Sequence, residues 1–489
     1  MLKSSLLVSL LSLLGSIVSF VSQVIIAKLY GTSTIMDNFI IINSMPQMLS
    51  GILVASLSYS LVPILLEAKL NQTNESNRNL LSSIIIIGAV TCSLGLLLEG
   101  LILHFFHGLD IFHTKVLALG ILVWIAAYLG IIIAYFNCYH NSNNSFLKPV
   151  LASMFPPFLT IILCELMGMQ LGILTLGLGL LLGNICALFF ITHNYKLQIN
   201  FHIEKIISDK TVRIFYLNLP FIVLSMLSFS VFQFIDSIWA PKIGASALSY
   251  LSYCQRLIVS IGTLVIIGPS TILIPHITEK YLNDKIDELL EDIVNVLKVI
   301  FLLGSYVTII WLFFGRNIIS IFFQRGAFDS ASTEGVASII PFMSLGMVFM
   351  LFVVILMRVL YVMKEYKKGS IIGVSSLFIY FLLSGILSPL FGAKGISFAY
   401  IVTWLLLTII SVKFILNGKS LSFFSKKSFI SSAVIFSILC ILFALNILRG
   451  DLVLFPLLFI VISFIYFLLI YSDEFFSIYL QRFKRKLFA

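Results

Sequence analysis

Long apolar runs, separated by short polar or charged breaks, recur along the whole chain. A helix needs about 20 apolar residues to cross a bilayer, whereas the strands of an outer-membrane barrel alternate over only about 10 residues. The runs therefore predict an all-α integral membrane fold with fourteen transmembrane helices. Their approximate ranges are 5–27, 38–66, 80–103, 116–139, 150–167, 171–192, 213–240, 246–276, 292–314, 336–362, 370–390, 395–416, 428–447 and 452–472.

Composition agrees with this fold, because 60% of the 489 residues are hydrophobic and only 11% are charged. Soluble domains have about 45–50% apolar and about 25% charged residues. The longest polar interruption, roughly 193–210, is too short for a soluble domain, so we expect the function to lie within the membrane. The six cysteines fall in or at the ends of apolar runs without a CxxC pair, which indicates packing rather than a disulfide or metal site.

The net charge of +10 is distributed between the apolar runs and not on one patch, so we expect no nucleic-acid partner. Of the 31 lysines and arginines, 23 lie at the N-terminus, in the connections after even-numbered runs and in the C-terminal tail, counting the adjoining ends of the runs as flanks. Seven lie after odd-numbered runs, and Arg256 lies within a run. Because positive charge is retained in the cytoplasm, both termini are predicted to be cytoplasmic.

Two segments of the chain match at an offset of about 213 residues. Residues 28–31 and 63–67 of the first copy correspond to residues 241–244 and 275–279 of the second. Six runs separate the copies, so both copies have the same orientation, as in transporters with parallel repeats. We therefore predict two pseudo-symmetric six-helix lobes and two additional C-terminal helices. The expected domains are 1–211 (N-lobe), 212–417 (C-lobe) and 418–489 (the last two helices and a basic cytoplasmic tail).

Polar residues follow single faces of several runs, at helical spacing. Serine can simply let helices pack closely, but an ionised residue in hydrocarbon costs at least ~2.5–3.5 kcal/mol unless it faces water or a partner. We therefore predict a hydrated cavity between the lobes. The candidate substrate-binding residues are Ser16, Ser19, Gln23, Asp37, Asn43, Gln47, Ser252, Arg256 and Ser260.

Four acidic residues or patterns need separate interpretations. Asp236, beside Gln233 in the seventh run, is a candidate for ion or proton coupling because it lies at membrane depth. Glu99 and Glu165 lie near the ends of runs, where we expect their side chains to snorkel to the interface. A histidine pattern without supporting ligands is interpreted as a solvated rim, and we expect no metal site; its members are His104, His107, Asp110 and His113.

Several segments resemble the MurJ (MviN) lipid II flippases of the multidrug/oligosaccharidyl-lipid/polysaccharide exporter superfamily. The matching segments occur in family order, and the most specific is Phe323–Asp329, with the sequence FQRGAFD. The others are 27–31, 37–39, 62–65, 252–257, 270–275 and 359–361. The resemblance implies a two-lobe fold that moves a polyprenyl-diphosphate-linked sugar lipid across the bacterial cytoplasmic (inner) membrane by alternating access. We expect a monomer that contacts membrane lipids and needs no cofactor.

The resemblance also implies roles for individual residues. Arg256 and Asp37 match the family pattern, whereas the arginines that face the family's cavity on the first two spans are replaced here. The residues at these positions are Ser16, Ser22 and either Ser50 or Gly51, and a family glutamate is replaced by Ala55. Some members bind Na⁺ with a span 7 aspartate and polar groups of spans 11 and 12. Here the aspartate would be Asp236, with Ser384 as the candidate ligand among the polar residues of span 11 (Tyr380, Ser384 and Ser388) and span 12 (Ser397 and Thr403). None of these is acidic or an amide, so coupling to Na⁺, to H⁺ or to the membrane potential stays open.

Three functions compete at this point. The first is a flippase for an undecaprenyl-diphosphate-linked glycan, either lipid II or a surface-polysaccharide unit as in the related Wzx exporters. The second is a cation-coupled drug antiporter of the MATE branch, which the last two helices and the Phe323–Asp329 segment disfavour. The third is a membrane glycan polymerase or ligase. The longest outer connection, residues 315–335, offers no convincing acid-base constellation, so we expect no enzyme.

Overall fold

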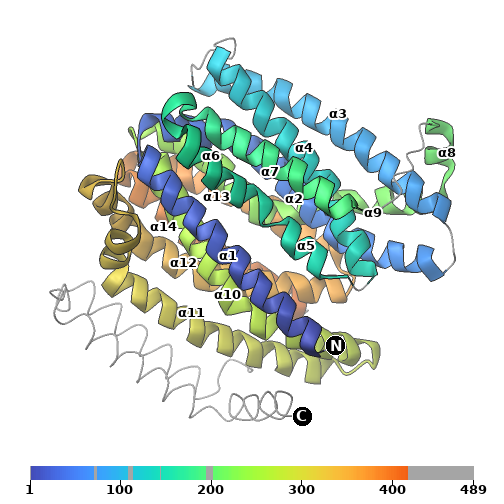
Figure 1. The fold of residues 1–489 in the computed structure, drawn as a ribbon. Coiled ribbons are helices and arrows are strands. Elements are labelled where there is room, and N and C mark those ends of the chain that lie inside the picture. The colour runs from blue at the N-terminus through green and yellow to red at the C-terminus, as the bar shows by residue number, and fades with distance from the viewer. Residues whose placement is uncertain (1, 71–73, 108–113, 144, 194–201, 417–489) are drawn as a thin grey trace. The chain divides into compact units, whose positions relative to one another are not determined.

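The computed structural model describes residues 2–70, 74–107, 114–143, 145–193 and 202–416, and these residues are mainly helical (Figure 1). The first helices are α1 (Leu2–Tyr30), α2 (Thr34–Leu70), α3 (Asn74–His107), α4 (Thr114–Ser142), α5 (Leu147–Ala152), α6 (Phe155–Leu171), α7 (Leu174–Thr192) and α8 (Ile203–Ser208). They are followed by α9 (Lys210–Trp239), the 3₁₀ helix η1 (Ala240–Lys242), α10 (Ala247–Leu282), α11 (Ile286–Phe323), α12 (Ser330–Val362), α13 (Tyr366–Phe391) and α14 (Ala393–Leu416).

Twelve helical segments of the described residues are long and apolar enough to cross a membrane. Each coincides with one of the first twelve predicted spans, so this part of the prediction is confirmed. The protein is therefore a multi-pass, all-helical membrane protein. The thirteenth and fourteenth predicted spans, 428–447 and 452–472, lie outside the described residues.

Two details of the fifth and sixth spans differ from the prediction. The run 150–167 was expected to be one helix, but the chain breaks at Ser153 and Met154, between α5 and α6. Pro156 occupies the first turn of α6, where its missing N–H costs no hydrogen bond. The turn after α6 was expected at residues 168–170 and instead lies at Gly172, whose φ of +56° is accessible to glycine without a steric penalty.

The chain forms two compact units that do not follow chain order. The first contains residues 1–249, 323–332 and 373–381, and the second contains the remaining described residues, 250–322, 333–372 and 382–416. The expected lobe boundary at residue 211 concerns the internal repeat, and it stays a prediction.

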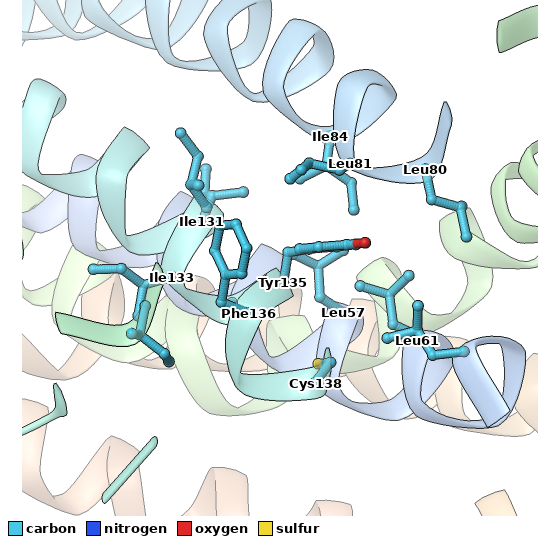
Figure 2. Packing of buried hydrophobic residues seen from close by; sticks show 14 of the residues in the cluster. Leu57, Leu61, Leu80, Leu81, Ile84, Ile131, Ile133, Tyr135, Phe136 and Cys138 are labelled. Carbon is cyan, nitrogen blue, oxygen red and sulfur yellow. The ribbon is translucent and has the colours of Figure 1, made fainter. Parts of the chain in front are cut away.

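The core of the first unit lies where α2 packs on α4 and α9, and where α3 packs on α4. Apolar side chains of α2, α3 and α4 face one another there (Figure 2); the labelled ones are Leu57, Leu61, Leu80, Leu81, Ile84, Ile131, Ile133, Tyr135, Phe136 and Cys138. Lipid tails are as apolar as leucine, so this contact is stabilised mainly by van der Waals packing and not by removal from water. Such packing gives α3 and α4 a defined register.

The second unit is organised around α11 and α12. Thr308 of α11 donates to the backbone oxygen of Ser344 at 2.9 Å, and Trp311 is buried. With 38 residues, α11 is roughly 57 Å long, which exceeds the ~30 Å of hydrocarbon in a bilayer. Its charged first turns are consistent with this length, since Asp292 forms an ion pair with Lys280 of α10 at 2.8 Å.

Candidate functional site

The end of α1 is joined to the loop between α11 and α12 through the backbone. The Ala327 N–H donates to the Lys28 carbonyl oxygen at 2.8 Å. The ring of Phe323 lies edge-on to Phe20 of α1, with centroids 5.7 Å apart. The loop is the Phe323–Asp329 segment, so this contact, which we call the Lys28–Ala327 junction, joins two of the segments that resemble the flippase family.

Two glycines permit the close backbone approach at the Lys28–Ala327 junction. Gly31 has φ +54°, and a Cβ there would lie 2.2 Å from the Ala327 oxygen. Gly326 has φ +61°, and a Cβ there would lie 2.3 Å from the Lys28 oxygen. Both positions combine a left-handed conformation with backbone atoms on the other side, so neither tolerates a larger residue without movement of the main chain.

A short chain of polar contacts continues from this junction. Asp329 caps α12, because its Oδ1 accepts hydrogen bonds from the backbone N–H and the hydroxyl of Ser332, both at 2.8 Å. The backbone N–H of Ser332 is the main reason that the pKa of Asp329 lies below its usual range. The Ser332 hydroxyl gives its proton to Asp329, so it accepts one from Thr32 at 2.8 Å. These hydrogen bonds connect the start of α2 to the start of α12.

Asp37 in the first turn of α2 holds the start of α10. Its Oδ2 accepts from the Ser246 backbone N–H at 2.7 Å, and its Oδ1 accepts from the Ser249 N–H at 2.8 Å and from the Ser249 hydroxyl. The carboxylate thus satisfies N–H groups that a helix start leaves without partners, and its charge suits the positive end of the helix dipole. The predicted contact of Asp37 with substrate stays a prediction.

Further along α2, polar side chains meet α9. Ser44 and Ser237 are both buried and share a hydrogen bond of 3.0 Å. Asn43 donates to Gln47 on the same helix at 3.1 Å, with Asn43 buried and Gln47 exposed. The structure thus brings two of the predicted substrate-binding residues together as a pair on α2.

Asp236 of α9 is buried, with 1% of its surface exposed, and accepts a hydrogen bond of 2.5 Å from the Tyr380 hydroxyl of α13. One helical turn earlier, the Nε2 of Gln233 is buried and has no hydrogen-bond partner among the residues that the structure describes. The Oγ of Ser384, one turn after Tyr380 on α13, is likewise buried without a partner in the described part of the chain. No local pattern around Asp236 indicates the Tyr380 contact, because 144 residues separate the two side chains.

The remaining predicted residues lie on α1 and α10. Ser16 and Ser19 are exposed and Gln23 is half-buried. The Ser16 hydroxyl donates to the Ser12 carbonyl of its own helix at 3.0 Å, as the packing interpretation of serine allows. In the second unit, Ser252 is buried, Arg256 half-buried and Ser260 exposed. Asp110 and His113 of the histidine pattern lie outside the described residues.

The family model and a sequence relative both indicate one family. The family model described as "Lipid II flippase MurJ" matches residues 26–470. A probable lipid II flippase MurJ of Buchnera aphidicola is 24% identical over 439 residues, covering 84% of this chain and 83% of that protein.

Solved structures show the same fold. A lipid II flippase MurJ in an inward closed conformation covers 99% of this chain and all of its own, with a TM-score of 0.77 and 20% identity. A multidrug resistance MATE family transporter of the MOP superfamily, in an inward-facing conformation, covers 87% of this chain and 98% of its own at a TM-score of 0.62 and 14% identity. The family model spans most of the sequence, and the chain belongs to the lipid II flippase MurJ family.

Proposed function

We propose that this protein is a flippase that carries an undecaprenyl-diphosphate-linked glycan precursor, lipid II, across the bacterial inner membrane by alternating access. The observation that carries the proposal is the family match over residues 26–470. The protein acts as a transporter and not as an enzyme, with its substrate and the surrounding lipids as partners. Both termini lie in the cytoplasm, as the distribution of lysine and arginine favours, and the transporter works as a monomer.

The substrate diphosphate is recognised by Arg256, in the α10 segment that also carries Ser252 and Ser260. A guanidinium binds phosphate oxygens with a fork of donors, which a lysine cannot reproduce. Ser16, where the family has an arginine, is exposed and supplies a hydroxyl instead of a charge. The protein therefore relies more on Arg256 than its relatives with several cavity arginines do, and a related polysaccharide lipid remains the competing substrate.

Coupling to an ion gradient supplies the energy for transport, with the membrane potential as the alternative source. Asp236 is the coupling residue, with Gln233 and Ser384 as candidate further ligands. What supports this role is the burial of Asp236 at membrane depth and its bond from Tyr380. Sodium prefers several oxygen ligands, whereas one carboxylate is sufficient for a proton, so the test must include both gradients.

The proposal is tested with the purified full chain in vesicles that contain lipid II, by measuring how much lipid a membrane-impermeant reagent reaches. Arg256→Ala should lower the initial flipping rate by about 10- to 100-fold, the effect of losing roughly 1.5–3 kcal/mol of charged hydrogen bonding. Arg256→Lys should restore little. Arg316→Ala is the matched control, because Arg316 forms an exposed ion pair with Glu334.

Two results would contradict the proposal. Lipid II that stays on one side of wild-type vesicles, while another diphosphate-linked sugar lipid crosses, would assign the protein to polysaccharide export. Transport of a cationic drug without any lipid movement would assign it to the MATE-type alternative. In cells, depletion of the protein should cause lipid II to accumulate in the inner leaflet.

A further inference from the structure

Glu99 of α3 is buried inside the first unit. The sequence predicted that its side chain would snorkel to the interface, and this expectation is wrong, because only 3% of the residue's surface is exposed. Neighbouring apolar residues on other faces of α3 are open, with Leu97 67% and Leu98 52% exposed. The carboxyl group therefore points into the contact of α3 with α4, which we call the α3–α4 seam.

Gly95 leaves space in the α3–α4 seam for the indole ring of Trp124 beside the Glu99 carboxyl group. A Cβ on Gly95, one turn before Glu99, would lie 2.1 Å from Cη2 of Trp124, so only glycine allows the ring of this α4 residue to lie against α3. In that position the Trp124 Nε1–H donates to Glu99 Oε2. An indole is a neutral donor, so it supports one oxygen of the carboxyl group without supplying a positive charge.

The second oxygen of the carboxyl group is not satisfied. Glu99 Oε1 is buried and has no hydrogen-bond partner among the described residues, and none of the ion pairs found there includes Glu99. Glu165, the other glutamate that was expected to snorkel, differs from Glu99: its side chain is exposed and forms an ion pair with Lys28 at 3.3 Å. A buried carboxylate with one neutral donor is unfavourable, whereas a carboxylic acid in the same place is not.

The titratable groups around Glu99 do not compensate a negative charge. Along the seam they are the buried Cys92 thiol and Tyr128, whose hydroxyl donates to the Ile85 carbonyl oxygen. His104 of α3 and Lys115 of α4 are both exposed, and none of the ion pairs among the described residues joins either to Glu99. Of the other helices that pack on α3, α8 and the start of α9 lie near Asn79, which donates to Asp209 at 2.9 Å. That contact is 20 residues, or roughly 30 Å of helix, from Glu99. Asp37 of α2 and Asp236 of α9 are acidic, so neither supplies the positive charge that an ionised Glu99 would need.

We propose that Glu99 is a proton-binding site: its carboxyl group carries a proton while α3 and α4 are packed, and loses it only when water enters the seam. The ligand is a proton and not a metal ion, because a single carboxyl group facing an indole provides too few oxygen ligands. The site is separate from the substrate and coupling residues named above. Opening of the seam is therefore linked to proton release.

Infrared difference spectroscopy of the full chain at neutral pH tests the protonation state directly. The wild-type minus Glu99→Gln spectrum should contain the C=O band of a protonated carboxylic acid and no carboxylate bands. Trp124→Phe should keep this band and shift it, because one hydrogen bond to the carbonyl oxygen is lost. Carboxylate bands in the first difference spectrum would overturn the proposal.

A second measurement tests the link to the seam and remains informative if a variant is less stable. The unfolding temperature of the wild type should fall as the pH rises from about 4.3, the pKa of a glutamate in the unfolded chain, towards the alkaline range, because over this interval the folded seam holds a proton that the unfolded chain has lost. In Glu99→Gln this fall should be lost, whereas Glu165→Gln, the matched control on the surface, should retain it. An equal pH dependence in wild type and Glu99→Gln would overturn the link.

Discussion

Asp37 holds the first turn of α10 through Ser249, which lies 212 residues later in the chain. The two residues open helices that belong to corresponding positions of the predicted internal repeat. One carboxylate therefore connects the first half of the sequence to the second, with three donors of Ser246 and Ser249 on its two oxygens.

Removal of this charge should loosen the start of α10. Asp37→Asn keeps the shape but replaces one acceptor oxygen by a donor, so we expect a loss of about 1–3 kcal/mol in the stability of this contact. Thermal unfolding in detergent measures the loss. Ser249→Ala, which removes only the hydroxyl donor, should have a smaller effect, and equal unfolding temperatures for Asp37→Asn and wild type would contradict the capping role.

Gly326→Ala should disrupt the Lys28–Ala327 junction. The new methyl group would meet the Lys28 oxygen in addition to straining the left-handed backbone, so the cost should exceed the ~1–2 kcal/mol of the conformation alone. Gly172→Ala is a matched control, with φ +56° and no atom within 4 Å of its Cβ. The unfolding temperatures of both variants are compared with that of the wild type. An equal decrease for the two variants would show that the close approach of Gly326 to the Lys28 oxygen does not contribute to stability.

Asp236→Asn should slow flipping and remove its dependence on the ion gradient. Tyr380→Phe should keep the gradient dependence but change the ion concentration at half-maximal rate, because the carboxylate loses its donor. The measurement is the flipping rate in vesicles with an imposed Na⁺ or H⁺ gradient. Normal transport by Asp236→Asn with an unchanged gradient dependence would remove Asp236 from the coupling step.

Asp209 should contribute stability that depends on pH. Burial opposes its ionisation, but hydrogen bonds from Asn79 and from the N–H groups of Thr211 and Val212 outweigh this and hold its pKa below the usual range. The contribution is therefore present above the unfolded-state pKa of about 3.9 and is lost as the pH falls below that value.

The difference in unfolding temperature between wild type and Asp209→Asn reports this contribution. It should be constant near neutral pH, corresponding to about 1 kcal/mol for the loss of a helix cap, and should shrink below about pH 4. Glu204→Gln, at an exposed position on the preceding helix α8, should show no such trend. A difference that grows as the pH falls would have the wrong sign for a stabilised carboxylate.

Single cysteines test the predicted orientation of the chain. Cysteines at Glu75 and Glu204 should be protected from a membrane-impermeant thiol reagent in intact cells, while one at Ser330 should react. All three positions are exposed, whereas Phe328, in the loop just before Ser330, is buried and unsuitable as a probe. The measurements use a background without the native cysteines, and labelling of Glu75→Cys from outside would reverse the orientation.

The spans could be predicted from the sequence because the thickness of the bilayer requires a minimum length of apolar helix. The turn at Gly172 could not, since several glycines and polar residues nearby offer equivalent helix ends. Individual side-chain contacts between segments far apart in the sequence could not be predicted either. The family resemblance placed Asp236 beside span 11, but nothing in the sequence selected Tyr380 over Ser384 as its partner. The burial of Glu99 depends on the space that Gly95 leaves for an indole of another helix.

The Lys28–Ala327 junction also constrains the order in which the protein is made. Chains emerge from the ribosome N-terminus first, at about 5–20 residues per second. Thr32 must therefore wait for Ser332, 300 residues later, before its hydrogen bond can form. At those rates the delay is about 15–60 s, during which the C-terminal end of α1 is in the membrane without its final neighbour. Helix α1 is synthesised before the other described helices, yet it is among the last to reach its finished surroundings.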